Sequence, residues 1–333
     1  MALLLRDPDL RTVLTMRDLV PLMERALAAF STGGAVQPVR TAVPVSPHGG
    51  YLGVMPGYLA APEALGLKAV AWYPGNAARG LPTHLATILL LDPETGALRA
   101  VMDGRLITGM RTAAVSAAAT RHLARAPARV LAVLGAGVQA RSHIEALLEV
   151  SAPEEIRVWS RTHARAERLA AQTRERFGVA ASAPATAEQA VRGADIICTV
   201  TGSATPVLHG AWLSPGAHIN AVGAPRPDWR ELDTDVIVRA RVFVDSRAAA
   251  VVEAGDIVGP VREGAITEAH IQAEIGEVFA GRHPGRTAAA DVTLFKSLGL
   301  AVEDVATAHF AYAQARARAV GQEIPLGQEF ASG

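Results

Sequence analysis

A run of apolar residues that ends in a glycine pair, Val130 to Ala140, restricts the possible folds of this chain more than any other stretch. Five apolar residues stop at Gly135, and an amphipathic run begins directly after the turn. The expected result is a strand, a tight turn and the start of a helix. Gly135 permits the sharp turn, Gly137 lets backbone N–H groups approach a pyrophosphate, and the small Ala140 lets helix and strand pack closely. The stretch predicts a dinucleotide-binding turn; the alternative is an ordinary structural turn.

The helix after this turn would direct its positive N-terminal end at the phosphates. The cofactor contacts are therefore expected from the turn itself and from the first residues of that helix. These residues are Gly135, Ala136, Gly137, Val138 and Gln139.

The next predicted strand, Ile156 to Trp159, indicates which dinucleotide binds. In the usual pattern such a strand ends in an acidic residue that accepts a hydrogen bond from the ribose 2′-OH. Here Ser160, Arg161 and Thr162 follow instead. No carboxylate repels a 2′-phosphate, and a guanidinium and two hydroxyls can bind one. We therefore predict NADP(H) rather than NAD(H); the alternative is that Arg161 is only a solvated cation at a helix start.

Length and composition fit a globular protein of two domains. The 333 residues are 50% hydrophobic and 19% charged, with a formal net charge of zero. That balance gives no sign of a nucleic-acid or anionic-membrane partner. The single cysteine, Cys198, lies in an apolar run and is expected to be a buried core thiol. Met1 to Leu5 is too short for a signal peptide or a membrane span, so cytoplasmic residence is expected.

The first hundred residues predict a mostly antiparallel sheet with one helix. Thr15 is expected to cap that helix, which ends near Gly33, and Asp92 to Gly96 reads as a hairpin turn. In the first strand Arg40 alternates with a valine set and therefore points to the opposite face. The expected strands are residues 39–45, 51–55, 66–72, 87–91 and 98–102.

From Val130 onward, apolar strands alternate with helical patterns. The expected strands are residues 130–134, 156–159, 196–200, 218–222 and 241–245. Alternation of this kind predicts an α/β fold, a doubly wound Rossmann-type NADP domain with helices on both faces of a parallel sheet. A small-residue helix at 108–125 links the two parts, and a last helix at 297–320 returns to the first. We expect an α+β domain of residues 1–118 plus 312–333 and an NADP domain of residues 119–311.

Six blocks of sequence together resemble the ornithine cyclodeaminase/mu-crystallin family, and the resemblance runs through nearly the whole chain. The blocks are QPVRT at 37–41, GYLGVMP at 50–56, RTAAVS at 111–116, GAGVQA at 135–140, GAHINAVG at 216–223 and FKSLGLAVED at 295–304. Residues 226–233, RPDWRELD, resemble the mu-crystallin branch in particular. The resemblance implies an NADPH-dependent ketimine reductase that transfers hydride to a C=N bond. It also implies a homodimer joined through the N-terminal sheets, so that the first domain serves substrate binding and dimerisation.

Reduction of an imine that bears an α-carboxylate requires an anion clamp and a proton donor. Arginine suits the clamp because its planar fork matches a carboxylate. Arg40, and Arg111 at the start of its helix, match family positions that hold the substrate carboxylate. Lys68 lies in an apolar strand, where a lysine is costly unless paired or functional, and it matches a family lysine that reaches the substrate. The alternatives are ion-pair partners for the arginines and a lysine that extends from a strand edge.

Two further residues are candidates for proton transfer or orientation. His84, just before a strand, can relay a proton near neutral pH, although a lone histidine is more often a satisfied polar group. Asp228 follows the strand that ends near Gly223 and can orient Arg226 or the substrate amine. By resemblance, residues on the cofactor side are expected to be Thr112, Thr201 and Gly223, with Lys296 in a nearby loop.

Other functions stay open at this stage. Cyclodeaminases of the family carry an aspartate where this chain has Pro225, which weakens that alternative. A second alternative is an NAD(P)-dependent dehydrogenase of the alanine type, and a third is a non-enzymatic protein that binds NADPH and a small ligand. No His/Cys cluster has zinc spacing, so no metal is expected. The expected partners are a small imine, or a keto acid with an amine, and a second copy of the chain.

Overall fold

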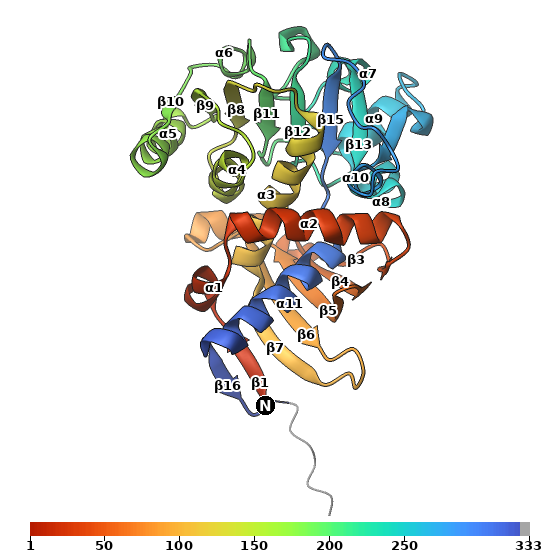
Figure 1. Cartoon of the computed structure of the whole chain (residues 1–333). Helices are drawn as coiled ribbons and strands as arrows, with labels where there is room; N and C mark the ends of the chain where they lie inside the picture. The colour runs from red at the N-terminus through yellow and green to blue at the C-terminus, as the bar shows by residue number, and fades with distance from the viewer. Residues whose placement is uncertain (327–333) are drawn as a thin grey trace, which may run out of the picture. The chain divides into compact units, whose positions relative to one another are not determined.

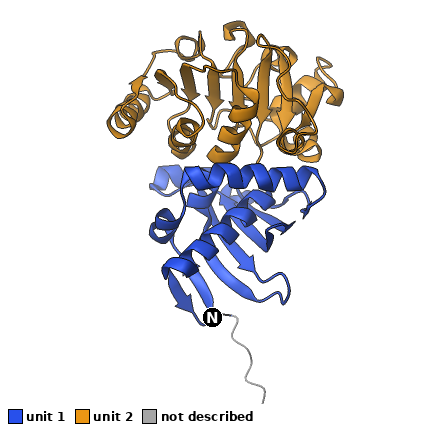
Figure 2. Ribbon diagram, in the orientation of Figure 1, with its two compact units in different colours: residues 1–111, 300–333 blue, residues 112–299 orange. Residues whose placement is uncertain are grey.

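The structure is a computed structural model and describes residues 1–326. The chain divides into two compact units, unit 1 with residues 1–111 and the segment from Leu300 onward, and unit 2 with residues 112–299 (Figure 2). The expected boundaries, 118 and 312, both fall inside helices, α3 (Gly104–Leu123) and α11 (Ala301–Arg318). The second boundary lies earlier than expected because α11 as a whole packs on two helices and three strands of unit 1.

Unit 1 is built on an eight-stranded sheet in the order β16-β1-β7-β6-β5-β4-β2, with β3 paired to β4 (Figure 1). All of its pairs are antiparallel except β1 with β7. The strands are β1 (Ala2–Leu5), β2 (Ala35–Val36), β3 (Thr41–Val45), β4 (Gly50–Ala60), β5 (Glu63–Trp72), β6 (His84–Leu91), β7 (Leu98–Asp103) and β16 (Gln322–Ile324). The mostly antiparallel sheet was correctly predicted.

Three helices accompany this sheet: α1 (Asp7–Val13), α2 (Met16–Ser31) and α11. The predicted start of α2 is confirmed, since the Asp18 N–H donates to Thr15 Oγ1 at 3.2 Å. Its buried face carries Leu19, Met23 and Leu27, and α2 packs against α11. Helix α11 in turn packs on β4, β5 and β6, so it covers the middle of the sheet. That arrangement brings the first turn of α11 to the strand that carries Lys68.

Three expectations for unit 1 need correction. Strand β1 and helix α1 were not predicted, because short segments with one buried side each carry little periodic signal. Residues 37–40 are not in a strand, so Arg40 precedes β3 instead of lying within it. Two valines of the alternating set are exposed, Val39 at 50% and Val43 at 52%, so the alternation does not mark a face covered within the chain. The predicted hairpin is confirmed, because Asp92 Oδ1 accepts the N–H groups of Glu94 and Thr95.

Unit 2 is the doubly wound α/β fold that the alternation predicted. Its eight strands are all parallel, in the order β10-β9-β8-β11-β12-β15-β13-β14. They are β8 (Val130–Leu134), β9 (Glu155–Trp159), β10 (Ala180–Ser182), β11 (Ile196–Thr199), β12 (His218–Ala221), β13 (Ala240–Val244), β14 (Ile271–Glu274) and β15 (Val292–Lys296). The strand order reverses between β8 and β11, and ligands of such sheets bind at that point, outside the carboxyl ends of the strands.

The helices of unit 2 connect these strands in alternation (Figure 1). They are α4 (Val138–Leu148), α5 (His163–Phe177), α6 (Ala187–Val191), α7 (Thr234–Arg239), α8 (Arg247–Glu253), α9 (Gly255–Arg262) and α10 (Ile275–Phe279). Strands β11, β12 and β15 are buried along their whole length, as continuous apolar runs predict. Cys198 in β11 is buried, and burial raises the pKa of its thiol to about 12, which fits the predicted core role.

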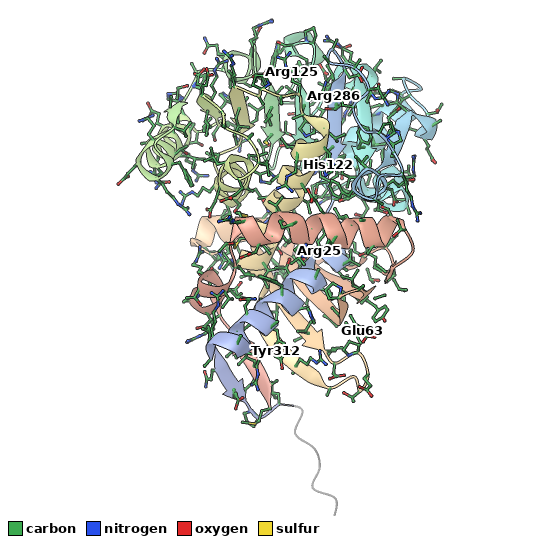
Figure 3. The ribbon with its side chains drawn as sticks, viewed as in Figure 1. Arg25, Glu63, His122, Arg125, Arg286 and Tyr312 are labelled. Atoms are coloured by element: carbon green, nitrogen blue, oxygen red, sulfur yellow. The ribbon has the colours of Figure 1, made fainter. Side chains whose placement is uncertain are left out.

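The opposite edge of this sheet, at the amino ends of its strands, is held by arginines near the end of α3 (Figure 3). Arg125 pairs with Asp195 at 2.5 Å, just before β11. Arg286 donates to the carbonyls of Leu123 and Gly216 at 2.7 and 3.0 Å. These bonds tie the end of α3 to the sheet and leave the carboxyl edge to the loops discussed below. Among the described residues, no helix is long and apolar enough to cross a membrane.

Candidate active site

In unit 1, four buried charged side chains form what we call the Lys68 cluster: Lys68, Arg111, Glu303 and Asp304. Lys68 Nζ lies 2.5 Å from Asp304 Oδ2. Arg111 pairs through Nε with Asp304 Oδ1 at 2.9 Å and through Nη1 with Glu303 Oε2 at 2.7 Å. The four side chains are at most 4% exposed. The prediction that Lys68 is a buried lysine is therefore confirmed.

The ionisation of this cluster follows from burial and from its own charges. Burial lowers the pKa of Lys68 to about 8, and Asp304 acts against that decrease. Burial alone would raise the pKa of Asp304, but Arg111 and Lys68 outweigh it, and the pKa lies below its ordinary value. At neutral pH the lysine is thus an ammonium and Asp304 a carboxylate. A cation with a pKa near neutrality can both bind an anion and release a proton.

The position of Arg111 corrects one expectation. It lies in the interior of α3 and not at its start, so the helix N-terminus adds nothing to anion binding at this residue. The alanine-rich pattern around it did not reveal that the helix begins seven residues earlier, at Gly104, directly after β7. The guanidinium is oriented instead by the two carboxylates of α11.

Arg40 lies near the Lys68 cluster on the half-buried segment before β3, and its charge also lowers the pKa of Lys68. The same segment is attached to the first turn of α11, because the Val302 N–H donates to Gln37 Oε1 at 3.0 Å. The structure therefore brings Arg40, Lys68 and Arg111 together within unit 1, as the sequence predicted. Glu303 and Asp304 were missed as partners, although both lie in the block that carried the family resemblance.

His84 is the first residue of β6 and pairs in register with Trp72 of β5. Lys68 pairs with Ile88 four residues further along β6, so the two side chains lie on the same face of the sheet at different levels. The Nδ1 atom of His84 lies 3.2 Å from Thr83 Oγ1, and desolvation lowers the pKa of the ring. The ring is therefore neutral at pH 7, and no hydrogen bond joins it to the Lys68 cluster.

In unit 2, the glycine turn has the predicted form. Strand β8 ends at Leu134, and Gly135 takes a φ of +129°. A Cβ there would lie 2.8 Å from the Val200 carbonyl oxygen, so the turn needs glycine. A Cβ at Gly137 would meet nothing within 4 Å, which leaves the N-terminus of α4 open to a ligand. These residues fit the pyrophosphate of a dinucleotide.

Strand β9 ends at Trp159, and the three residues that follow lead into α5. Ser160 is half-buried, and Arg161 and Thr162 are exposed. Thr162 is the N-cap of α5, whose first turn carries no acidic residue. The end of this strand is thus hydroxyl-rich and positively charged, as the sequence predicted.

A second buried group of charges in unit 2, which we call the Lys296 cluster, consists of Lys296, Asp256 and Glu231, all fully buried. Lys296 is the last residue of β15, not part of a loop as expected. Its Nζ lies 2.8 Å from Asp256 Oδ2 and also donates to the Gly223 carbonyl. Asp256 Oδ1 accepts the backbone N–H groups of Glu231 and Leu232 at 2.8 and 3.0 Å.

Glu231 connects two of the predicted cofactor residues. Its Oε1 accepts the Thr201 N–H at 2.6 Å, and its Oε2 accepts the Gly223 N–H at 2.8 Å. A Cβ at Gly223 would lie 2.2 Å from Oε2, so only glycine permits this approach. Burial and the nearby Asp256 raise the pKa of Glu231 to about 7. The sequence analysis did not single out Glu231 or Asp256, although Glu231 lies in the block at 226–233 that resembles the mu-crystallin branch.

Two candidates remain, Asp228 and Thr112. Arg226 pairs with Asp228 at 3.2 Å, and both side chains are well exposed. The pairing agrees with the idea that Asp228 orients Arg226. Thr112 is buried on α3, next to Arg111 in the sequence. No group of three or more His, Cys, Asp or Glu side chains in residues 1–326 could hold a metal ion.

Comparison with known proteins finds relatives that match most of the chain. The family model described as ornithine cyclodeaminase/mu-crystallin matches residues 3–319. Ketimine reductase mu-crystallin of Rattus norvegicus is 49% identical over 297 residues, which cover 88% of this chain and 91% of the relative.

Two solved structures resemble the chain along nearly its whole length. Delta(1)-pyrroline-2-carboxylate reductase of Thermococcus litoralis, in complex with NADH and L-proline, has a TM-score of 0.95 at 40% identity and covers 97% of this chain and 100% of its own. An archaeal alanine dehydrogenase dimer with bound NAD has a TM-score of 0.92 at 35% identity, with coverage of 97% and 98%. Together with the family match, these findings confirm the predicted resemblance: the chain belongs to the ornithine cyclodeaminase/mu-crystallin family.

Proposed function

We propose that the protein is an NADPH-dependent reductase of ketimines and cyclic imino acids, including imines formed from a keto acid and an amine. The relatives are reductases that act on C=N bonds and use a nicotinamide cofactor, by their names and bound ligands. The observation that carries the proposal is the Lys68 cluster, a buried group of two cations and two carboxylates in which the ammonium of Lys68 has a pKa of about 8.

Arg40, Lys68 and Arg111 of unit 1 each have a task in this reaction. Arg111 and Arg40 bind the substrate carboxylate, since a guanidinium offers paired N–H donors to a planar anion. Lys68 donates a hydrogen bond or a proton to the imine nitrogen. Its pKa near 8 leaves it protonated at neutral pH and still able to give the proton up. Bound NADPH supplies two electrons and one hydrogen for the reduction.

Charge balance favours a substrate with one carboxylate. Lys68, Arg111 and Arg40 contribute three positive charges, and Glu303 and Asp304 contribute two negative ones. The sum is one net positive charge, which one carboxylate neutralises. A second carboxylate would have to be desolvated without a partner cation among these five side chains, and that is costly.

The preference for NADPH rests on residues 160–162. Arg161, Ser160 and Thr162 bind the 2′-phosphate at the end of β9, while the turn from Gly135 to Gln139 binds the pyrophosphate. Thr201 and Gly223 hold the nicotinamide side through their loops, which Glu231 connects. Solved relatives carry NADH or NAD, so NADPH and NADH are compared directly in the test below.

The proposal includes a homodimer formed through unit 1. Large apolar residues on its outer strands are exposed, among them Val36 at 68% and Val43 at 52%. Exposed apolar residues grouped on neighbouring strands are typical of an interface. The archaeal alanine dehydrogenase structure is described as a dimer. Light scattering of the purified protein at micromolar concentration measures the mass directly.

The test of function is NADPH oxidation with 1-piperideine-2-carboxylate, followed by fluorescence, with NADH in parallel. We expect rapid oxidation that favours NADPH. Arg161→Ala should weaken the binding of NADPH by about tenfold or more and leave the binding of NADH unchanged, because charge-assisted hydrogen bonds to the 2′-phosphate are lost. Arg168→Ala, an exposed arginine further along α5, is the matched control. Equal rates with both cofactors in the unmodified protein would contradict the NADPH assignment.

The alanine-type dehydrogenase is the second candidate, because an archaeal alanine dehydrogenase shares the fold at 35% identity. It predicts turnover of pyruvate and ammonia with NAD(H), indifferent to Arg161→Ala. Cofactor binding without oxidation of either substrate class would favour the non-enzymatic ligand-binding function instead.

A further inference from the structure

Lys68 and Lys296 are the only lysines in the sequence, and every other strongly basic side chain is an arginine. Both lysines are buried within charge clusters. A guanidinium keeps its charge in any protein environment, whereas a buried ammonium can lose its proton near neutral pH. The chain therefore has titratable cations at two buried positions and uses arginine everywhere else.

The charge state of Lys68 depends on few groups. Its neighbours on the adjacent strands, Met55 of β4 and Ile88 of β6, are apolar. The charged groups that act on its pKa come from three other segments: Asp304 on α11, Arg111 on α3 and Arg40 before β3. Both arginines, like burial itself, disfavour the ammonium. Asp304 is thus the carboxylate that keeps Lys68 protonated.

Glu303 and Asp304, adjacent on α11, contact different members of the cluster. Asp304 contacts both cations, Lys68 through Oδ2 and Arg111 through Oδ1. Glu303 contacts Arg111 through Oε2, and its Oε1 accepts the Leu300 N–H at 3.1 Å in the capping box of the helix. The helix therefore offers one carboxylate that contacts Lys68 directly and a neighbour that reaches the cluster through Arg111.

We propose that Asp304 is a positioning residue of the reductase site, which holds Lys68 in its charged form and orients it together with Arg111. Glu303, by contrast, orients Arg111 alone. This inference rests on the proposed function, in which Lys68 meets the imino acid.

Loss of the Asp304 charge should lower the pKa of Lys68. With Asp304 neutral, burial, Arg111 and Arg40 all push the pKa of Lys68 in the same direction, downward. A carboxylate this close shifts a neighbouring pKa by about one to three units. Asp304→Asn should therefore release the Lys68 proton at a pH lower by about that amount. Glu303→Gln removes an equal charge from the same cluster but not from direct contact with Lys68, so it should shift the Lys68 titration clearly less than Asp304→Asn does.

The direct test is NMR of protein labelled at lysine Nζ and titrated with NADP⁺ bound. Two lysines give two signals, and Lys68→Arg identifies which one belongs to Lys68. We expect a midpoint near pH 8 in the unmodified protein, a midpoint lower by about one to three units in Asp304→Asn, and a clearly smaller shift in Glu303→Gln. Equal midpoints in the unmodified protein and Asp304→Asn would overturn the proposal.

Kinetics supply a readout that a merely structural role would not move. In Asp304→Asn the alkaline limb of kcat/KM should move to lower pH by the same amount as the NMR midpoint. In Glu303→Gln the KM for the imino acid should rise, and the alkaline limb should move clearly less than in Asp304→Asn. The dissociation constant of NADPH should change less than twofold in both variants. A uniform loss of activity without movement of the limb in Asp304→Asn would assign Asp304 to folding alone.

Two further results keep the test decisive. If Asp304→Asn does not fold, the unmodified protein decides, because a Lys68 midpoint below pH 7 would mean that Asp304 does not keep it charged. If the NMR shifts appear as expected but the unmodified protein reduces no imine, the proposed function fails and Asp304 has no reductase site to serve, so the two failures are told apart.

Discussion

The two buried charge clusters of this protein differ in what their carboxylates hold. In the Lys68 cluster, Asp304 pairs with two cationic side chains. In the Lys296 cluster, Asp256 and Glu231 accept mainly backbone N–H groups from separate loops, and Lys296 itself also donates to a backbone carbonyl. The first cluster therefore fixes side chains, and the second fixes the main chain.

This difference separates chemistry from support. A cation held by side chains can shift its hydrogen bonds to a bound anion without any movement of the backbone. A carboxylate that ties loops together cannot change partners without loosening them. We therefore expect substitutions in the Lys68 cluster to act on turnover, and those in the Lys296 cluster to act on stability and on the loops after β11 and β12. The predictions below test that division.

The largest effect is expected from Lys68→Met, which retains the side-chain volume but removes the ammonium. Loss of a positioned proton donor lowers kcat by about 10²- to 10⁴-fold. Asp304 keeps Arg111 as a partner, so the fold should survive. Steady-state kinetics measure the loss of kcat, and NADPH binding measured in parallel shows whether the cofactor site is intact. A variant that retains more than about a third of the activity would show that Lys68 is not the donor.

Lys296→Met should have the opposite profile. It leaves Asp256 buried without its cation, which typically costs about 3–5 kcal/mol of folding free energy. Lys68→Met should cost clearly less, since Asp304 still faces Arg111. Urea unfolding of the two variants, with the same substitution at the chain's only lysines, gives a matched comparison. Equal destabilisation by both variants would remove the distinction between the clusters.

In the Lys296 cluster, Glu231 should make the stability of the fold depend on pH. Its pKa in the fold is about 7, raised from 4.5 by burial and by Asp256. An acid whose pKa is raised on folding stabilises the fold below its unfolded pKa, and this contribution is lost as pH rises through the folded pKa. Relative to Glu231→Gln, the unmodified protein should therefore lose stability between about pH 4.5 and pH 7.

The expected loss is on the order of 2–3 kcal/mol, since each pKa unit is worth about 1.4 kcal/mol. Urea unfolding of both proteins at pH 4.5 and pH 8 measures it as a difference of differences, which cancels the other titrating groups. A constant difference across that range would mean that Glu231 stays ionised in the fold. The glutamine also cannot accept both loop N–H groups, so NADPH affinity should fall as well.

Sequence reasoning reached the chemistry of the cations but not of their partners. The glycine turn and residues 160–162 follow from rules that act over a few neighbouring residues, and Lys68 was noticeable as a charge within an apolar strand. Asp304 lies 236 positions from Lys68 along the chain, and only the packing of α11 on β5 brings them together. Arg111 was misplaced on its helix because alanine-rich residues give little amphipathic signal.

The two carboxylates of the Lys296 cluster were missed for a related reason. Asp256 and Glu231 act on backbone groups of several loops, and no motif records such contacts. The strand predicted at residues 39–45 begins only at Thr41, so Arg40 was wrongly placed within it. Val39 and Val43 of its alternating set lie exposed on unit 1. Alternation reports which residues would share a face, but not whether that face is covered within one chain.

The smallest effect is expected from the exposed pair, Arg226 and Asp228, which serves as the reference for both buried clusters. Its side chains are 43% and 60% exposed, so water screens the pair, and Asp228→Asn should change the free energy of unfolding by less than about 1 kcal/mol. With stability nearly constant, any decrease in kcat/KM would report a contact with the substrate and not a loss of fold. A tenfold decrease would add Asp228 to the catalytic residues and show that the chemistry is not confined to side chains held in a buried cluster. An unchanged kcat/KM would leave the catalytic roles with the cations of unit 1.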